Sequence, residues 1–381
     1  MQKEFVQKHG GPAPRYTSYP TAPHFHSGID GNVYARWLGQ LTPGQTLSLY
    51  IHIPWCDRLC WFCGCNTKQT LKYEPLKTYL TALENEMETI SGLIDPGCRV
   101  TALHLGGGSP TMLQPDDMLA LNTMLRSRFS FDPDAEISVE MDPNDLTADK
   151  YDALAEIGMT RASIGVQDFD EAVQKAINRE QTFEQTRDVV EQVRARGVRS
   201  VNCDVLYGLP HQTRQSVERS ISQVLSLEPD RIALFGYAHV PWMKTHQKMI
   251  DETALPDLTE RFAQMNRAAS ALTSAGYTAI GIDHFALPGD SLAVAAASGA
   301  MRRNFQGYTS DTADALIGMG ASSIGQLPQG YIQNQPSTGE YQRRANRGEL
   351  PVVRGFELST EDRIRARIIE FLMCDFAFSF A

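Results

Sequence analysis

The chain alternates short apolar segments with longer amphipathic ones, and this alternation repeats six times between residues 47 and 275. The apolar segments are rich in β-branched residues and have the length of buried strands. The amphipathic segments place their apolar residues at helical spacing, as Leu76, Leu80 and Leu83 do after the first apolar segment. Strands and helices that alternate in this way predict a parallel sheet covered by helices, which defines the α/β class.

Six strands and six helices are expected from this pattern. The strands span 47–54, 100–105, 136–141, 160–167, 200–207 and 231–238, and the helices span 75–90, 116–129, 146–157, 182–197, 213–227 and 258–275. Right-handed crossovers between successive parallel strands wind such units into a full or partial barrel, whose chemistry lies at the carboxyl ends of the strands. We therefore expect a partial (β/α)6 barrel, with a doubly wound open sheet as the alternative.

The segments outside the repeats divide the rest of the chain. Residues 1–45 are rich in Pro, Gly, Thr and aromatic residues and show neither a helical nor a strand period, so we expect an extended N-terminal arm over the active site. Residues 46–280 form the expected barrel, 281–350 an extension of the core that closes the site, and 351–381 the start of a C-terminal helical domain. Because little chain follows the apolar helix expected at 360–371, this last domain is expected to be truncated.

Composition narrows the class of protein. The net charge is -10 and the sequence pI is about 5.4, so broad electrostatic attraction to nucleic acid or to an anionic membrane is not expected. The chain begins Met-Gln-Lys-Glu without an apolar signal core, and no apolar run reaches the roughly 18 residues that cross a bilayer. We therefore expect a cytoplasmic protein without nucleic-acid or membrane partners.

Four cysteines lie close together directly after the first expected strand. Cys56, Cys60 and Cys63 have the spacing CxxxCxxC, and Cys65 follows. Three thiolates on one loop can hold three irons of a 4Fe-4S cluster. The fourth iron is then open to chelation by S-adenosylmethionine (SAM), which an electron passed through the cluster splits to give a deoxyadenosyl radical. The spacing and the aromatic Phe62 resemble the radical-SAM signature, while a zinc site and a disulfide pair are the alternatives.

Glycines and polar residues gather at the ends of the expected strands, where a barrel places its site. The turn Gly106-Gly-Gly-Ser109 can bring backbone N–H groups close to a carboxylate. Glu140 lies inside an apolar strand, so it either binds the ammonium group of SAM or forms a structural salt bridge. Asp204 has the same two interpretations, or it accepts hydrogen bonds from ribose hydroxyls. Acid–base chemistry and a structural role are equally open for His239, Asp283 and His284.

Longer motifs are more specific than the cysteine spacing. They are Pro14-Arg-Tyr-Thr-Ser-Tyr-Pro-Thr21, Tyr50-Ile-His-Ile-Pro-Trp-Cys56, Cys65, Glu140-Met-Asp-Pro143, Gly165-Val-Gln-Asp-Phe169, Asn178-Arg-Glu180, Asp283-His-Phe-Ala286 and Asn304-Phe-Gln-Gly-Tyr-Thr309. Through these motifs almost the whole chain resembles the oxygen-independent coproporphyrinogen III oxidases, radical-SAM enzymes of haem synthesis. Two residues depart from the family pattern, Ser109 in place of Thr and Leu105 in place of Trp.

The resemblance implies a partial barrel that holds one 4Fe-4S cluster and two SAM molecules. The implied cluster ligands are Cys56, Cys60 and Cys63, and Cys65 is implied to be needed for activity without binding the cluster. The implied contacts of the SAM on the cluster are Tyr50, Gly107, Glu140, Ala238 and Ile324. The implied contacts of the second SAM are Phe62, Gly108, Ser109, Gln167, Arg179 and Asp204.

The implied reaction is the oxidative decarboxylation of coproporphyrinogen III to protoporphyrinogen IX. A deoxyadenosyl radical takes a hydrogen from the β-carbon of a propionate, CO2 leaves and a vinyl group remains, twice for each substrate. Arg15, Arg302 and Arg303 are candidates for holding the substrate carboxylates, or are ordinary surface charges. We further expect an electron donor of the flavodoxin or ferredoxin type, an electron acceptor, and a monomeric protein.

Two other functions use a related core. Haem chaperones of the same superfamily usually lack the cysteine that matches Cys65 and the motif at 14–21, both of which are present here. Methylating or ring-opening radical-SAM enzymes should differ around residues 304–308, where this chain is oxidase-like. The oxidase is therefore the preferred function, and these two classes are the alternatives.

Overall fold

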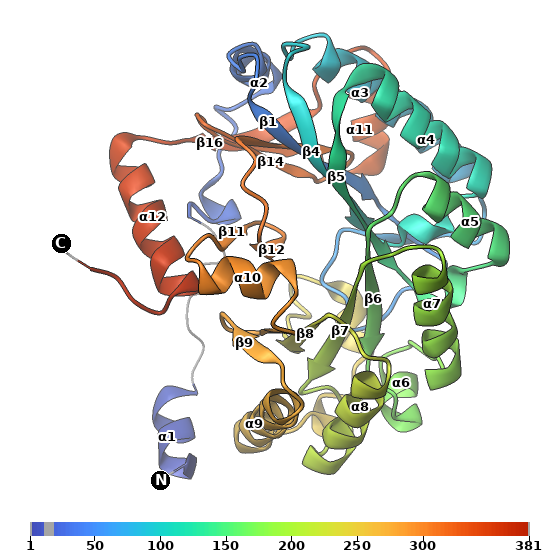
Figure 1. The fold of residues 1–381 in the computed structure, drawn as a ribbon, viewed down its shortest axis with the longest axis vertical. Coiled ribbons are helices and arrows are strands. Elements are labelled where there is room, and N and C mark those ends of the chain that lie inside the picture. Colours follow the sequence, from blue (N-terminus) through green and yellow to red (C-terminus); the bar gives the residue numbers. More distant parts are fainter. Residues whose placement is uncertain (1, 11–18, 380–381) are drawn as a thin grey trace.

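The computed structural model describes residues 2–10 and 19–379 (Figure 1). Its centre is a sheet of twelve strands in the order β16-β15-β14-β13-β1-β4-β5-β6-β7-β8-β10-β9. The six parallel strands expected from the sequence are neighbours in chain order: β1 (Thr46–Ile53), β4 (Arg99–Gly107), β5 (Ser130–Met141), β6 (Arg161–Gln167), β7 (Ser200–Tyr207) and β8 (Arg231–Gly236). Because this order has no reversal, the partial barrel is confirmed and the doubly wound alternative is wrong.

Helices follow the parallel strands and cover the outside of the barrel (Figure 1). The six expected helices are α3 (Glu74–Ser91), α4 (Pro115–Arg128), α5 (Ala148–Glu156), α7 (Phe183–Ala195), α8 (Arg214–Ser226) and α9 (Leu258–Ser274). Thr182 and Gln185 form the expected capping box at the start of α7, and Thr213 caps α8 in the same way. Local capping signals therefore fix where these helices begin.

Successive side chains of each strand point to opposite faces of the barrel wall. In β1 the outward set, Leu47, Leu49 and Ile51, is apolar and buried in the main core. The inward set includes Tyr50 and His52, which line a cavity. The interior of this barrel is therefore largely polar, in contrast to a barrel filled by a hydrophobic core.

Short strands extend both edges of the parallel sheet. At the β1 edge they are β13 (Ala315–Met319), which is parallel to β1, and then the antiparallel β14 (Ile324–Leu327), β15 (Gly330–Asn334) and β16 (Val352–Glu357). At the β8 edge they are the antiparallel β10 (His284–Ala286) and β9 (Thr278–Ile280). The sequence predicted an extension of the core in this part of the chain but not its strands, because strands of three to six residues show little period.

The prediction that residues 1–45 contain no helix is wrong. The segment includes α1 (Gln2–His9), the 3-10 helix η1 (Ala22–His24) and α2 (Gly31–Leu38). The side chain of Asp30 caps α2, and the helix buries Tyr34, Trp37 and Leu38, a spacing of three and four residues in a helix too short to show a clear period. α1 contacts α9 and α2 contacts β16, so the two helices lie at opposite edges of the sheet.

The other elements surround the two ends of the barrel. They are β2 (Trp55–Cys56), β3 (Lys68–Gln69), η2 (Pro110–Met112), η3 (Pro143–Asp145), α6 (Glu171–Ala176), η4 (Thr245–Met249), η5 (Glu252–Ala254), α10 (Ser291–Ala297), β11 (Arg302–Asn304), β12 (Gly307–Thr309), α11 (Thr338–Ala345) and α12 (Thr360–Cys374). Among the described residues, every helix is too short or too polar to cross a membrane.

Candidate active site

Two cavities share one wall inside the barrel. The larger, of about 620 Å³, is lined by inward-facing residues of all six parallel strands and by the segment 304–311. The smaller, of about 220 Å³, lies against the cysteine loop, residues 56–65. Five residues line both cavities and form the shared wall: Cys65, Gly107, Glu140, Ser163 and Asp204. The expected site residues from separate strands therefore meet at one place.

The cysteine loop is held at both of its ends. At its start Cys56 lies in β2, which pairs with β3, and the Cys56 Sγ is 3.2 Å from the Thr67 Oγ1. At its end the ring of His246 lies 2.7 Å from the Cys63 carbonyl oxygen, and Lys244 Nζ donates to the Cys65 carbonyl at 3.0 Å. The loop is therefore a fixed part of the site.

The three cysteines with radical-SAM spacing line the smaller cavity. Hydrogen bonds from the Cys65 thiol and N–H lower the pKa of Cys63 despite its burial, whereas the bond to Cys63 and burial raise the pKa of Cys65. Burial raises the pKa of Cys56 and of Cys60, although Arg179 opposes the rise at Cys60. Cys63 is therefore the most easily ionised thiol of the loop.

The donor set fits a cluster rather than a single ion. Within the described part of the chain, no group of three or more Cys, His, Asp or Glu side chains converges closely enough to hold one metal ion. Ligands of a 4Fe-4S cluster stand apart because each binds a different iron. The guanidinium of Arg179, whose Nη1 is 3.6 Å from the Cys60 Sγ, supplies positive charge beside the thiolates such a cluster needs. A 4Fe-4S cluster is thus the group this cavity suits.

Glu140 lies at the carboxyl end of β5, in the shared wall. One carboxylate oxygen accepts from the Gly107 N–H at 2.9 Å, and the other is 3.1 Å from the His104 Nε2. Burial alone would raise the pKa of Glu140, but these partners outweigh it and lower the pKa. In the described part of the chain no lysine or arginine pairs with it, so the alternative of a structural salt bridge to either residue is wrong.

The glycine turn after β4 lets the backbone approach its neighbours closely. Gly107 has a φ of 114°, which favours glycine, and a Cβ there would lie 2.6 Å from the ring of His52. A Cβ on Gly108 would lie 2.5 Å from the carbonyl oxygen of Trp55. The N–H groups of this turn are engaged within the protein: Gly107 donates to Glu140, Gly108 to the Ile53 carbonyl at 2.8 Å and Ser109 to the Trp55 carbonyl at 2.7 Å. The glycines therefore allow close packing of the backbone, but these three N–H groups are not open to the carboxylate of a ligand as expected.

Asp204 faces the shared wall from β7. Asn202 Nδ2 donates to one of its oxygens at 2.8 Å, and the Ser163 Oγ is 3.4 Å from the other. Burial raises its pKa to about 6, although Asn202 opposes the rise, and repulsion by Glu140 adds to it. The Asn202 Oδ1 is buried without a hydrogen-bond partner among the described residues. This corner of the wall therefore has polar groups that a polar ligand would satisfy.

Arg179 and Gln167 stand on the far side of the smaller cavity. Arg179 donates to Asp142 at 2.9 Å and to the Gly165 carbonyl at 2.8 Å, and its buried Nε has no partner in the described chain. Burial would lower the pKa of this guanidinium, but the attraction of Asp142 outweighs it and raises the pKa. Gln167, the last residue of β6, has a φ of 64°, a conformation that costs a non-glycine residue energy.

The remaining expected residues divide between the two cavities, with one exception. Tyr50 and Ile324 line the larger cavity, where the Tyr50 ring stacks on His104 at 5.6 Å. Phe62 and Ser109 line the smaller cavity together with Gly108, Gln167 and Arg179. Ala238 is exposed in the loop after β8 and lies in the wall of neither cavity.

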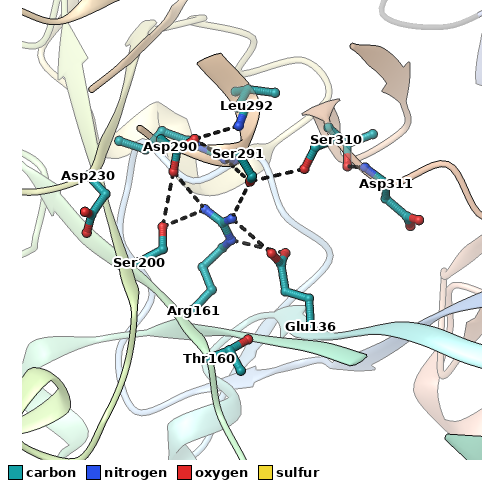
Figure 2. Close-up of polar contacts among 12 residues, drawn as sticks. Glu136, Thr160, Arg161, Ser200, Asp230, Asp290, Ser291, Leu292, Ser310 and Asp311 are labelled. Atoms are coloured by element: carbon teal, nitrogen blue, oxygen red, sulfur yellow. Dashed lines mark hydrogen bonds and ion pairs between the residues drawn. The ribbon is translucent and has the colours of Figure 1, made fainter. Parts of the chain in front are cut away.

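The floor of the larger cavity is a network of paired charges at the amino ends of the strands (Figure 2). Arg161 Nη2 is 3.0 Å from Glu136 and its Nη1 is 3.5 Å from Asp290, while Arg231 Nη2 is 2.6 Å from Asp290. Arg161 also donates to Ser200 at 2.8 Å. Two arginines and two carboxylates thus balance one another.

Residues of the site that were missed from the sequence include His52, His104, Ser163 and Asn202. Each is a polar residue inside an apolar strand, and each side chain faces the larger cavity. The same signal marked Glu140, so it was available for these residues as well. Arg302 and Arg303 line a neighbouring cavity of about 240 Å³, and Arg15 lies outside the described residues.

Comparison with known proteins defines the class first. The model of the radical SAM superfamily matches residues 50–224 of this chain, which include the cysteine loop and strands β4 to β7. The partial barrel and its cysteine loop are thus those of a radical SAM protein.

More similar proteins define the family. The oxygen-independent coproporphyrinogen III oxidase of Paracoccus denitrificans is 49% identical over 363 residues, which are 95% of this chain and 80% of the relative. "Coproporphyrinogen III oxidase, anaerobic 1" of Cereibacter sphaeroides has the same identity and coverage. The solved coproporphyrinogen III oxidase of Escherichia coli, described as a radical SAM enzyme, superposes with a TM-score of 0.92 at 39% identity, covering 98% of this chain and 84% of its own. The chain belongs to the family of oxygen-independent coproporphyrinogen III oxidases.

Proposed function

We propose that this chain carries out the reaction of its family, the anaerobic oxidative decarboxylation of coproporphyrinogen III to protoporphyrinogen IX in haem biosynthesis. The observation that carries the proposal is the shared wall, which joins the cysteine loop to a polar cavity of about 620 Å³. A volume of this size is in the range of pockets that bind organic ligands. When bound, a 4Fe-4S cluster and SAM supply the hydrogen-atom abstraction that the reaction requires.

Cys56, Cys60 and Cys63 are the cluster ligands in this proposal, and Cys65 is not a ligand. The CxxxCxxC spacing supports this division, because it includes Cys56, Cys60 and Cys63 and leaves out Cys65. Cys65 also differs in position, since it lies in the wall between the cavities and so reaches the substrate side. It is thus placed for the catalytic role expected from the resemblance.

Two SAM molecules bind in this proposal, one against each side of the shared wall. Of the expected contacts of the first, Tyr50 and Ile324 line the larger cavity, and Gly107 and Glu140 the wall itself. The expected contacts of the second line the smaller cavity: Phe62, Gly108, Ser109, Gln167, Arg179 and Asp204. Glu140 holds an ammonium group, and the raised pKa of Asp204 marks a carboxyl group that gains from polar ligand atoms. Ala238 is left out because it reaches neither cavity.

Product analysis tests the proposed function. The anaerobically reconstituted protein is incubated with coproporphyrinogen III, SAM and dithionite, and the products are separated by mass spectrometry. We expect the masses that correspond to the loss of CO2 and two hydrogens from one and then from two propionates. Intact coproporphyrinogen with full cluster loading would contradict the function, and tight haem binding in the same preparation would favour the chaperone.

An electron donor of the flavodoxin or ferredoxin type also belongs to the proposal. Segments 56–72 and 240–250 carry five lysine and arginine residues and one aspartate, in a chain with a net charge of -10. The first segment contains the cysteine loop and the second contacts it, and Leu71 and Trp242 on these segments are 86% and 75% exposed. Exposed apolar side chains among lysines suit a transient partner with an acidic surface. Charge reversal at Lys72 and Lys248 should slow turnover with reduced flavodoxin but not with dithionite.

A monomer is sufficient for this function, because a single chain supplies both cavities. Light scattering on the reconstituted protein should give the mass of one chain, 42.3 kDa. A stable dimer that retains full activity would remove this part of the proposal.

A further inference from the structure

His284 is a partly buried histidine in the wall of the larger cavity and belongs to neither set of expected SAM contacts. It is the first residue of β10, where it pairs with Ala233 of β8, so the antiparallel edge strand brings it into the barrel. Its side chain is 12% exposed. The ring meets Phe235 edge-on at 5.6 Å and Tyr308 at 5.5 Å. Two aromatic neighbours therefore fix the orientation of the imidazole.

The neighbouring carboxylate decides which ring nitrogen carries the proton. The Nδ1 of His284 is 2.8 Å from Oδ1 of Asp283, whose side chain is 5% exposed. A carboxylate only accepts hydrogen bonds, so Nδ1 is the protonated nitrogen. In the neutral imidazole Nε2 is then an acceptor. Nε2 forms no hydrogen bond with any described residue, although it lies at the far end of a side chain that faces the cavity.

We propose that Nε2 of His284 accepts a hydrogen bond from a pyrrole N–H group of the porphyrinogen. This inference rests on the proposed function. A porphyrinogen has four pyrrole N–H donors, and its methylene bridges let a ring tilt so that its N–H group points at the acceptor. A buried acceptor that is already oriented costs little entropy on binding. The adjacent rings of Phe235 and Tyr308 also line the cavity and offer apolar surface to a pyrrole.

The two carboxylates of the shared wall already have hydrogen-bond partners. Glu140 accepts from Gly107 and is 3.1 Å from His104, and one oxygen of Asp204 accepts from Asn202. Both carboxylates also belong to the shared wall, on the side of the proposed cofactors. His284 lines only the larger cavity, so its acceptor is directed to the substrate.

Substrate binding without turnover tests the proposal. The cluster-loaded protein is dialysed anaerobically against coproporphyrinogen III in the absence of SAM and reductant. We expect His284→Leu to raise the Kd about 10-fold, because the donor on the ligand is left unpaired. His284→Gln keeps an acceptor at similar reach and should stay within about 3-fold of the wild type. The control is His239→Leu, since His239 lines neither cavity.

Two modified ligands identify which group of the substrate binds to His284. N-methylated coproporphyrinogen lacks N–H donors, so the wild type and His284→Leu should bind it with equal Kd. The tetramethyl ester keeps the pyrrole N–H groups, so His284→Leu should weaken its binding about 10-fold, as for the free acid. An effect of His284→Leu that persists with the N-methylated ligand, or that vanishes with the ester, would overturn the proposal in favour of packing or of carboxylate binding.

Iron content is measured in the same samples, and SAM binding is measured in parallel samples of each variant without coproporphyrinogen. Both should equal the wild-type values in every variant, because neither His284 nor His239 is an expected cluster ligand or an expected SAM contact. If His284→Leu does not fold, the proposal is tested with His284→Gln and with the wild-type protein. A wild-type protein that binds coproporphyrinogen III and its N-methylated form with equal Kd contradicts the proposal. A wild-type protein that binds no coproporphyrinogen at all would contradict the proposed function itself.

Discussion

The two ends of the barrel strands contain the same kinds of charged residue, but only one end pairs them fully. At the floor, Arg161 is paired with Glu136 and Asp290 (Figure 2). Arg231 shares Asp290 with it. The partners of Asp290 lower its pKa although burial alone would raise it. The floor thus gains stability from charges that satisfy one another, and it offers little to a ligand.

At the opposite end the same strands hold groups that the protein itself leaves incompletely satisfied. Asp204 has a raised pKa, the Arg179 Nε is buried without a partner among the described residues, and Gln167 is held at a positive φ. Such features cost stability and persist where a bound ligand or a reaction needs them. The comparison shows which end of this barrel is adapted for stability and which for chemistry.

At the carboxyl ends of the strands, called the upper end below, the largest effect on activity is expected from removal of a cluster ligand. Cys60→Ala should lose the four-iron EPR signal and most of its iron, and turnover should fall by at least about 10⁶-fold because the reaction depends on the cluster. Iron analysis and EPR after anaerobic reconstitution measure this. Cys203→Ala is the matched control, since Cys203 is buried on the outward side of β7. A Cys60→Ala protein with normal iron would refute the ligand assignment.

At the floor the largest effect should be on stability alone. Asp290→Ala leaves two buried arginines without their shared partner, which should lower the free energy of unfolding by about 3–5 kcal/mol. Urea denaturation of the cofactor-free protein measures it. In Asp152→Ala, which breaks the exposed pair with Arg196, the loss should stay below about 1 kcal/mol. Equal losses in the two variants would mean that the floor is not specially stabilised.

Asp204 should make the upper end sensitive to pH. Its pKa rises from 3.8 to about 6 on folding, so the folded protein holds the proton more tightly and stability falls as the pH rises through this range. Asp204→Asn should therefore raise the free energy of unfolding of the cofactor-free protein by about 1–3 kcal/mol at pH 8. Near pH 4 the gain should largely disappear.

The same variant should lose the second SAM while it keeps the cluster. Equilibrium dialysis should give close to two SAM molecules per wild-type chain and about one per Asp204→Asn chain, on the proposal of two sites. A stability gain that is equal at pH 4 and pH 8 would show that burial of the charge is not its cause.

The smallest effect concerns backbone strain. Gln167→Gly should raise the free energy of unfolding by about 0.5–1 kcal/mol, because glycine adopts a positive φ more readily. It should also weaken binding of the second SAM. His211→Gly, at an exposed residue with a φ of 62°, should give a similar stability gain without any change in SAM binding. Loss of SAM affinity in both variants would point to a general change in the barrel.

The sequence was a good guide to the barrel because its signals are local. The alternation of apolar strands and amphipathic helices, and capping residues such as Thr182, act over a few residues and predicted the parallel strands and their helices. The short strands at the sheet edges were missed because long-range pairing, such as that of His284 with Ala233, decides them. The helix α2 was missed because it spans only two turns.

The cavities, like the edge strands, could be predicted only in part from local sequence signals. Polar residues at strand ends could be expected to meet, since parallel strands bring their carboxyl ends to one edge. The pairing of Glu140 with His104, however, depends on the register between β4 and β5. It also depends on the inward direction of the His104 side chain. The division of the expected residues between two cavities depends on side-chain volumes throughout the barrel.

The wall common to both cavities has a consequence for how occupants influence each other. A molecule on one side that shifts Glu140 or Asp204 changes the surface met by a molecule on the other side. The two binding free energies are then linked, and the link is reciprocal: the factor by which a cofactor changes the affinity for the porphyrinogen equals the factor by which the porphyrinogen changes the affinity for that cofactor. One coupling constant, measured from either direction, would therefore describe how the presence of substrate governs the retention of cofactor.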